Sequence, residues 1–138
     1  ENYKFALNKA DVITKGNDIT IVASGIMVAE SLKAVLKLKE EGISAELISA
    51  NTIKPLDEET ILNSIKKTNH VVTCENHNVI GGLYSAVSEM LIEKYPLHVD
   101  KIAVMDQFGQ VGKYSELLNY YHLTSNDIYN VVKKNLNK

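Results

Sequence analysis

The chain has 138 residues, of which 45% are hydrophobic and 23% charged, as expected of one globular domain that buries its own core. Its net charge of -2 excludes the broad basic surface that nucleic-acid binding needs, and its single cysteine excludes an internal disulfide and a multi-cysteine zinc site. No apolar run approaches the roughly 18 residues of a transmembrane helix. We therefore expect no nucleic acid and no membrane among its partners, and a location in the reducing cytoplasm.

The first fifty residues contain a linker, two strands and a helix. Residues 1–10 show no periodicity and do not begin with Met, so we expect a linker from an upstream domain of a longer or processed protein. Residues 11–14 form a short strand before a Gly-Asn turn. The continuous apolar run at 19–24 predicts a strand that is buried on both faces. A helical stripe follows over 27–41, and 43–50 is a second buried strand, which completes a right-handed βαβ crossover.

The middle of the chain repeats this alternation. Asp57 is a good N-cap for a helix, because Pro55 prevents helix before it and acidic residues fill the first turn. Residues 70–75 form the third strand of the parallel series. A polar loop follows, and a helical stripe then begins at Leu83 and stops at Tyr95-Pro96.

The last part of the chain adds one strand and two helices. Residues 101–105 form the fourth parallel strand, and the glycine-flanked loop 106–112 follows it. A helix that includes Tyr121 comes next, and Thr124 caps a final helix that runs to about Leu136. Strands that alternate with helices predict an α/β sandwich around a mostly parallel sheet, without a second domain.

Polar side chains gather where two of the predicted strands end. Ligands of open parallel sheets bind outside the carboxyl ends of the strands, at the point where the strand order reverses. If strand 19–24 is central and the next two strands flank it, this point lies between the ends of strands 19–24 and 70–75. The candidate residues of a ligand crevice or an interface are Ser24, Gly25, Glu75, Asn76, His77, Gly81, Gly82 and Asp106.

Each chemical reading of these residues has a structural alternative. Glu75 and His77 could do acid–base work, but no nucleophile or orienting group accompanies them, so we favour polar groups at a rim or in contact with a neighbour. The amides of Gly81-Gly82 could hold a phosphate, but close packing at a tight turn is the favoured reading. Asp106 could belong to the site, or it could cap the Phe108-Gly109 turn.

The remaining candidates are read as structural. Cys74 falls inside a buried strand, where a thiol is a core residue rather than a nucleophile. The spacing of His70, His98 and His122 does not fit a metal site, so all three are structural or at the surface. The residues by themselves therefore predict no catalytic, cofactor-binding or metal-binding residue in this chain.

Several motifs, taken together in their order and spacing, resemble the C-terminal domain of the transketolase family. The likeness covers nearly the whole chain, with the domain at residues 11–138. The matching segments are Lys15 to Gly25, Ile53 to Asp57, Val72 to His77 with Gly81-Gly82-Leu83, and Asp106 to Gly109.

The resemblance implies a fold and sets limits on the identity of the parent enzyme. The fold is a three-layer α/β/α sandwich with a five-stranded, mostly parallel sheet, in which the first strand is an antiparallel edge. The same domain also ends deoxyxylulose-phosphate synthases and the beta subunits of 2-oxoacid dehydrogenases. Glu-Asn-His before Gly-Gly, and the Phe-Gly-Gln-Val-Gly stretch, look more like transketolase.

The resemblance also implies a function for the full enzyme. A transketolase moves a two-carbon ketol unit between sugar phosphates, as in the pentose phosphate pathway, with thiamine diphosphate and a divalent metal such as Mg or Ca. In the family other domains bind these ligands across a dimer interface, so we expect the cofactor and the metal to lie outside this chain. The chain would then be inactive alone and would support a homodimer, with upstream catalytic domains or a separate N-terminal subunit as partner. A small-ligand regulatory module, with Gly81-Gly82 and His77 as contacts, is the alternative from another class.

Overall fold

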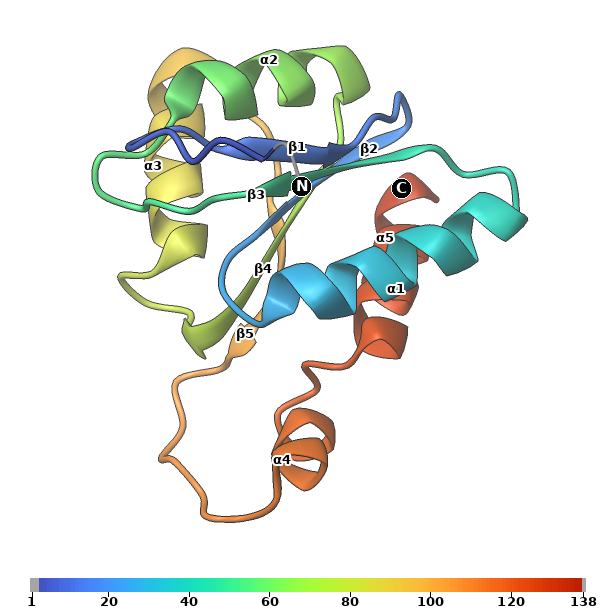
Figure 1. Ribbon diagram of the computed structural model, residues 1–138, viewed down its shortest axis with the longest axis vertical. Coiled ribbons are helices and arrows are strands. Elements are labelled where there is room, and N and C mark those ends of the chain that lie inside the picture. Colours follow the sequence, from blue (N-terminus) through green and yellow to red (C-terminus); the bar gives the residue numbers. More distant parts are fainter. Residues whose placement is uncertain (1–2, 138) are drawn as a thin grey trace.

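A five-stranded sheet forms the middle layer of the molecule (Figure 1). The structure is a computed structural model that describes residues 3–137. The strand order is β1-β3-β2-β4-β5, in which β2 to β5 run parallel and β1 pairs antiparallel with β3. The strands are β1 Asp11–Thr14, β2 Ile19–Ala23, β3 Ala45–Ser49, β4 Val71–Asn78 and β5 Asp100–Val104. The predicted fold class is confirmed, including the antiparallel edge strand.

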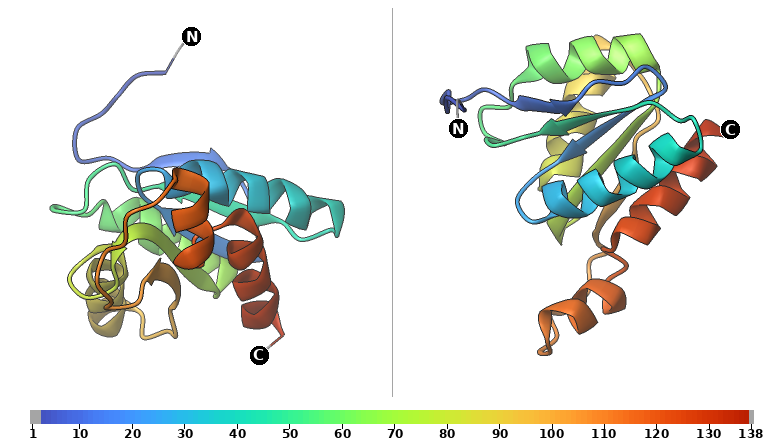
Figure 2. Two further views of the ribbon diagram at one scale, coloured as in Figure 1. Left: turned by 90° about the horizontal axis from the view of Figure 1, so that it is seen from below. Right: turned by 45° about the vertical axis from the view of Figure 1, so that its right-hand side comes forward.

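Helices cover both faces of the sheet, as the views in Figure 2 show. Helices α1 (Met27–Glu40) and α5 (Ser125–Leu136) pack on one face, and α2 (Glu58–Thr68) and α3 (Leu83–Lys94) pack on the other. The short helix α4 (Tyr114–Tyr120) lies beyond the carboxyl ends of β4 and β5. Among residues 3–137, no helix is long and apolar enough to cross a membrane.

The two apolar layers explain why the central strands read as continuous hydrophobic runs. Every residue of β2 and β3 is buried. Alternate side chains point to opposite faces, so Ile19 and Ile21 pack against α1 and α5, while Val22 packs against α2 and α3. Burial on both faces removes the polar alternation that an exposed sheet would show.

The predicted helix starts at Asp57 and Thr124 are confirmed. The Asp57 side chain accepts a hydrogen bond from the backbone N–H of Thr60, and Thr124 forms a reciprocal capping box with Asp127. Asp57 also accepts from the N–H of Ala10 at 3.0 Å. One carboxylate therefore caps α2 and fastens the segment that leads into β1.

Strand β4 is longer than the sequence predicts. It continues from the expected end at Glu75 to Asn78, so part of the expected polar loop is extended backbone. The reason is its pairing with β5, which breaks register after Cys74 and resumes where Asn78 pairs with Val104. This irregularity re-aims the side chains between the two paired regions.

Candidate functional site

The carboxyl ends of β2 and β4 lie side by side, because β2 is central and β3 and β4 flank it. Ala23 pairs with Cys74, and the N–H of Ser24 donates to the Cys74 carbonyl at 3.0 Å. Gly25 follows with a φ of +56°, and a Cβ built on it would lie 3.4 Å from the Asn76 side-chain oxygen. The structure thus brings Ser24, Gly25 and Asn76 together at the predicted reversal point.

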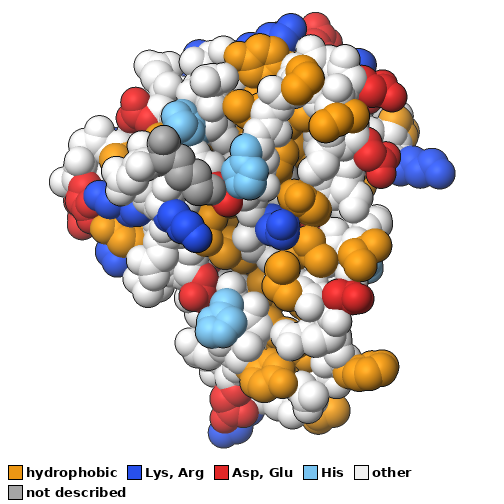
Figure 3. Space-filling model, turned by 180° about the vertical axis from the view of Figure 1, so that it is seen from behind, with side chains coloured by type: hydrophobic (Ala, Val, Ile, Leu, Met, Phe, Trp, Pro, Cys, Tyr) orange, Lys and Arg blue, Asp and Glu red, His pale blue; other side chains and the backbone are white. Residues whose placement is uncertain are grey.

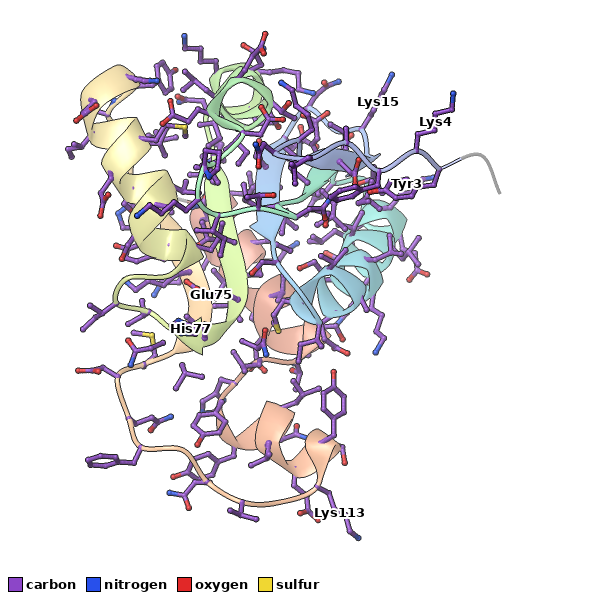
Figure 4. The ribbon with its side chains drawn as sticks, turned by 60° about the vertical axis from the view of Figure 1, so that its left-hand side comes forward. Tyr3, Lys4, Lys15, Glu75, His77 and Lys113 are labelled. Atoms are coloured by element: carbon purple, nitrogen blue, oxygen red, sulfur yellow. The ribbon has the colours of Figure 1, made fainter. Side chains whose placement is uncertain are left out.

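Glu75 does not face this crevice. Its side chain is 1% exposed and turns toward α3 (Figure 4), where its two oxygens accept from the backbone N–H groups of Leu83 at 2.8 Å and Tyr84 at 2.9 Å. These N–H groups have no partner within the helix, and the positive end of the helix dipole favours a carboxylate there. The expected place of Glu75 at the rim is therefore wrong, because the side chain is buried and caps the first turn of α3.

The close-packing reading holds for Gly82. An ideal Cβ on Gly82 would lie 2.0 Å from the nearer carboxylate oxygen of Glu75, so only glycine fits between that side chain and the helix start. Gly81 has a φ of +80°, and its N–H donates to the Ser85 hydroxyl at 2.8 Å. A phosphate would have to displace Glu75 from the Leu83 and Tyr84 amides, so the geometry does not support phosphate binding at this turn.

The other predicted groups form local contacts at the rim. His77 is exposed, and its Nδ1 lies 3.1 Å from the carbonyl oxygen of Asn78. The Asn78 side-chain amide donates to Asp106 at 3.0 Å, which joins the end of β4 to the residues after β5. Glu75 and His77 therefore do not share a reaction site, because one is buried against α3 and the other faces outward.

The loop after β5 is closed by a residue that the sequence did not single out for this role. The Tyr121 hydroxyl accepts from the N–H of Gln110 at 2.7 Å and donates to the carbonyl of Phe108 at 3.1 Å. The alternative role of Asp106, capping the Phe108-Gly109 turn, is not observed, because its carboxylate binds Asn78. A tyrosine eleven residues after Gln110 carries no local sequence signal for such a bridge.

Cys74 is a core residue, as predicted. It is fully buried, and burial raises the pKa of its thiol to about 12, with a further rise from the neighbouring charge of Glu75. A thiol in this state is a poor nucleophile at neutral pH.

The histidines do not assemble a metal site. The ring nitrogen Nδ1 of His70 lies 2.7 Å from the Asn135 side-chain oxygen, at the amino end of β4. Within residues 3–137, no group of three or more His, Cys, Asp or Glu side chains is placed to hold a metal ion. The first turn of α3 is already occupied by Glu75. The described residues therefore do not fit a metal-bound diphosphate.

Comparisons with known proteins agree on one family. Residues 8–128 match the family model described as "Transketolase, C-terminal domain". A 6-deoxy-6-sulfo-D-fructose transketolase subunit of Clostridium sp. (strain MSTE9) is 47% identical over 93% of this chain, which covers 40% of that protein. A 1-deoxy-D-xylulose-5-phosphate synthase of Heliobacterium modesticaldum is 35% identical over 93% of this chain, which covers 20% of that protein.

A solved structure gives the same answer. The chain of a "Split gene transketolase, inactive beta4 tetramer" is 43% identical, with a TM-score of 0.93 over 99% of this chain and 45% of that one. The chain thus spans less than half the length of the relatives described above. The resemblance expected from its motifs is confirmed, and the chain belongs to the transketolase C-terminal domain family.

Proposed function

We propose that this chain is the C-terminal domain of a thiamine-diphosphate-dependent transketolase, which transfers a two-carbon ketol unit between sugar phosphates. The observation that carries the proposal is the TM-score of 0.93 at 43% identity with a split-gene transketolase chain. The Clostridium transketolase subunit, at 47% identity, supports the same reading. That relative is named for a sulfosugar. The proposal therefore includes the sugar phosphates of the pentose phosphate pathway as one set of substrates, and ketol-transfer assays with different donor sugars would identify the donor.

Within such an enzyme the role of this domain would be structural. The groups with reactive chemistry are used by the fold itself, since Glu75 caps α3 and Cys74 is buried with a raised pKa. Thiamine diphosphate and its divalent metal would then bind to other parts of the enzyme, and the domain alone would be inactive. Residues 1–10 would connect it to the upstream domain, although residues 1 and 2 lie outside the described part of the chain.

The rim at the strand ends is the proposed contact with the catalytic section of the enzyme. Gly25, Asn76, His77, Gly81 and Asp106 are all exposed there, around the half-buried Ser24. The catalytic section would be an upstream domain or a separate N-terminal subunit, in an assembly that contains two copies of the chain. The single cysteine, buried as a thiol, is compatible with a cytoplasmic enzyme.

Substitution of His77 tests the role of this rim. In the full-length protein assembled with its catalytic section, His77→Ala should weaken assembly or ketol transfer. His98→Ala is the matched control, because His98 lies in the loop before β5, at the opposite end of the sheet. Sedimentation velocity and a ketol-transfer assay measure the two effects. If the His77→Ala protein shows unchanged assembly and kinetics, His77 is not part of the interface.

A second candidate is a deoxyxylulose-phosphate synthase, which the 35% identity with the Heliobacterium enzyme supports. Product analysis of the full-length protein distinguishes the two candidates. Formation of deoxyxylulose phosphate in place of ketol transfer would favour the synthase.

A further inference from the structure

The segment from Met105 to Tyr120 projects from the end of the sheet, away from the three-layer body (Figures 1 and 2). We call residues 105–120 the protruding segment. Phe108 is 94% exposed and Val111 is fully exposed, although both are apolar. Met105, Tyr114 and Tyr120 are also more than half exposed, and hydrophobic side chains gather on this part of the molecule in Figure 3. Monomeric soluble proteins rarely expose so many apolar side chains on one part of their surface, and such a patch marks a site of interaction.

The composition of the protruding segment is that of a protein interface. The loop 105–112 contains one charged residue, Asp106, and no lysine or arginine. The centres of protein interfaces are depleted in charge and enriched in Phe, Tyr and Met. A cavity of about 240 Å³ lies between α4 and the ends of β4 and β5, and is lined mainly by apolar side chains such as Ile26, Val104 and Leu117. Such a cavity can accept an apolar anchor from a partner.

Tyr121 gives this loop its shape. Its hydroxyl bridges Phe108 and Gln110, on either side of Gly109, and its ring packs edge-on against Tyr120 with centroids 4.9 Å apart. The same side chain lines the cavity. Because the two bonds join the loop backbone to the end of α4, they fix the direction in which Phe108 and Val111 point. A loop that is already ordered loses less entropy on binding.

We propose that Tyr121 holds the protruding segment as a contact element that binds the catalytic section of the transketolase, with Phe108 and Val111 at the centre of the contact. This inference rests on the proposed function and adds the residues that carry the assembly. The occupant is a separate catalytic subunit, because the relatives at 47% and 43% identity are named as a transketolase subunit and a split-gene transketolase chain. The segment also continues the polar rim through the Asn78–Asp106 hydrogen bond.

A charge placed on the surface tests the contact. Val111→Asp, in the full-length protein titrated with the catalytic section from the same organism, should raise the dissociation constant at least about tenfold, because the carboxylate would be buried without a partner. Ile92→Asp on α3 is the matched control, since Ile92 is 74% exposed on another part of the surface, and should leave the constant unchanged. If Val111→Asp and Ile92→Asp change the dissociation constant equally, the proposal is overturned. Loss of self-association alone would assign the surface to a second copy and would also overturn it.

Tyr121→Phe tests the positioning role separately. Removal of the hydroxyl should speed hydrogen exchange at the Gln110 amide by about threefold to tenfold and weaken assembly, while the melting temperature changes little. Tyr129→Phe is the control, because it removes a hydroxyl on α5 that donates to Glu41, the residue directly after α1. Unchanged Gln110 exchange, or faster exchange with unchanged assembly, overturns the role of Tyr121. If the unsubstituted protein does not bind the catalytic subunit, this proposal fails, and if it also shows no ketol transfer, the proposed function fails with it.

Discussion

Gly82→Ala tests the contact that organises the end of β4. A Cβ at this position would lie 2.0 Å from a carboxylate oxygen and 2.8 Å from the carboxyl carbon of Glu75, and 3.1 Å from the carbonyl oxygen of Asn78. The backbone of Gly82 is extended, with a φ of -101°, so the variant introduces no backbone strain. Its cost is the displacement of Glu75 from the first turn of α3.

The magnitude follows from the bonds that would be broken. Glu75 accepts two backbone N–H groups, and each hydrogen bond to a charged group contributes about 1.5–3 kcal/mol net. Allowing for partial retention of one bond, we expect Gly82→Ala to lower the free energy of unfolding by about 3 kcal/mol. This is a large part of the roughly 5–15 kcal/mol that stabilises a typical domain. Gly81 has a φ of +80°, and a Cβ built on it would have nothing within 4 Å. Gly81→Ala should therefore lower the free energy of unfolding by only about 1–2 kcal/mol, the cost of the left-handed backbone.

Urea unfolding followed by circular dichroism measures these values, and a double-mutant cycle identifies the cause. Glu75→Ala by itself leaves the Leu83 and Tyr84 amides without their acceptor, and it also removes the atoms with which the new methyl group collides. In that background Gly82→Ala should therefore cost less than about 1 kcal/mol, a coupling of about 2 kcal/mol. If Gly82→Ala costs the same with and without Glu75, the explanation of this turn is wrong.

Two further predictions concern buried ionisable groups. Burial alone raises the pKa of Asp57, but the N–H of Ala10, the hydroxyl and N–H of Thr60 and the charge of Lys9 outweigh it and lower the pKa below its ordinary value. Asp57→Ala should therefore lower the free energy of unfolding by about 1–2 kcal/mol at pH 7, as for other lost N-caps. This gap in stability between the variant and the unsubstituted protein should narrow as the pH falls below about 3.9 and through the lowered pKa of Asp57. A gap that is constant down to pH 2 in urea titrations would contradict this. For Cys74, whose pKa is about 12, labelling by a thiol reagent at pH 8 should follow global unfolding, and fast labelling of the native protein would show that the thiol is accessible.

The strand and helix pattern could be predicted because its signals are local. The continuous apolar runs at 19–24 and 43–50 contain the observed β2 and β3, and the caps at Asp57 and Thr124 start the observed helices. The family resemblance predicts the antiparallel pairing of β1. The motifs indicate the family through their order and spacing more than through any one residue.

The details of the strand-end region depend on contacts between distant segments. The extension of β4 to Asn78 depends on pairing with β5, so residues 76–78 alone do not predict this extension. The sequence places Glu75 at the rim because it is the last residue of the predicted strand 70–75, but its partners are backbone amides of α3, which carry no side-chain signal in the sequence. The role of Tyr121 was missed for the same reason, since its bonds go to backbone atoms of a loop.

Calorimetric titration with thiamine diphosphate and Mg²⁺ tests the central proposal most directly. The titration is made on this chain alone, on the catalytic section alone and on the two together. If the chain is a structural C-terminal domain, heat of binding should appear only in samples that contain the catalytic section, and ketol transfer should be highest in the assembled enzyme. Tight binding of thiamine diphosphate by this chain alone would contradict the account.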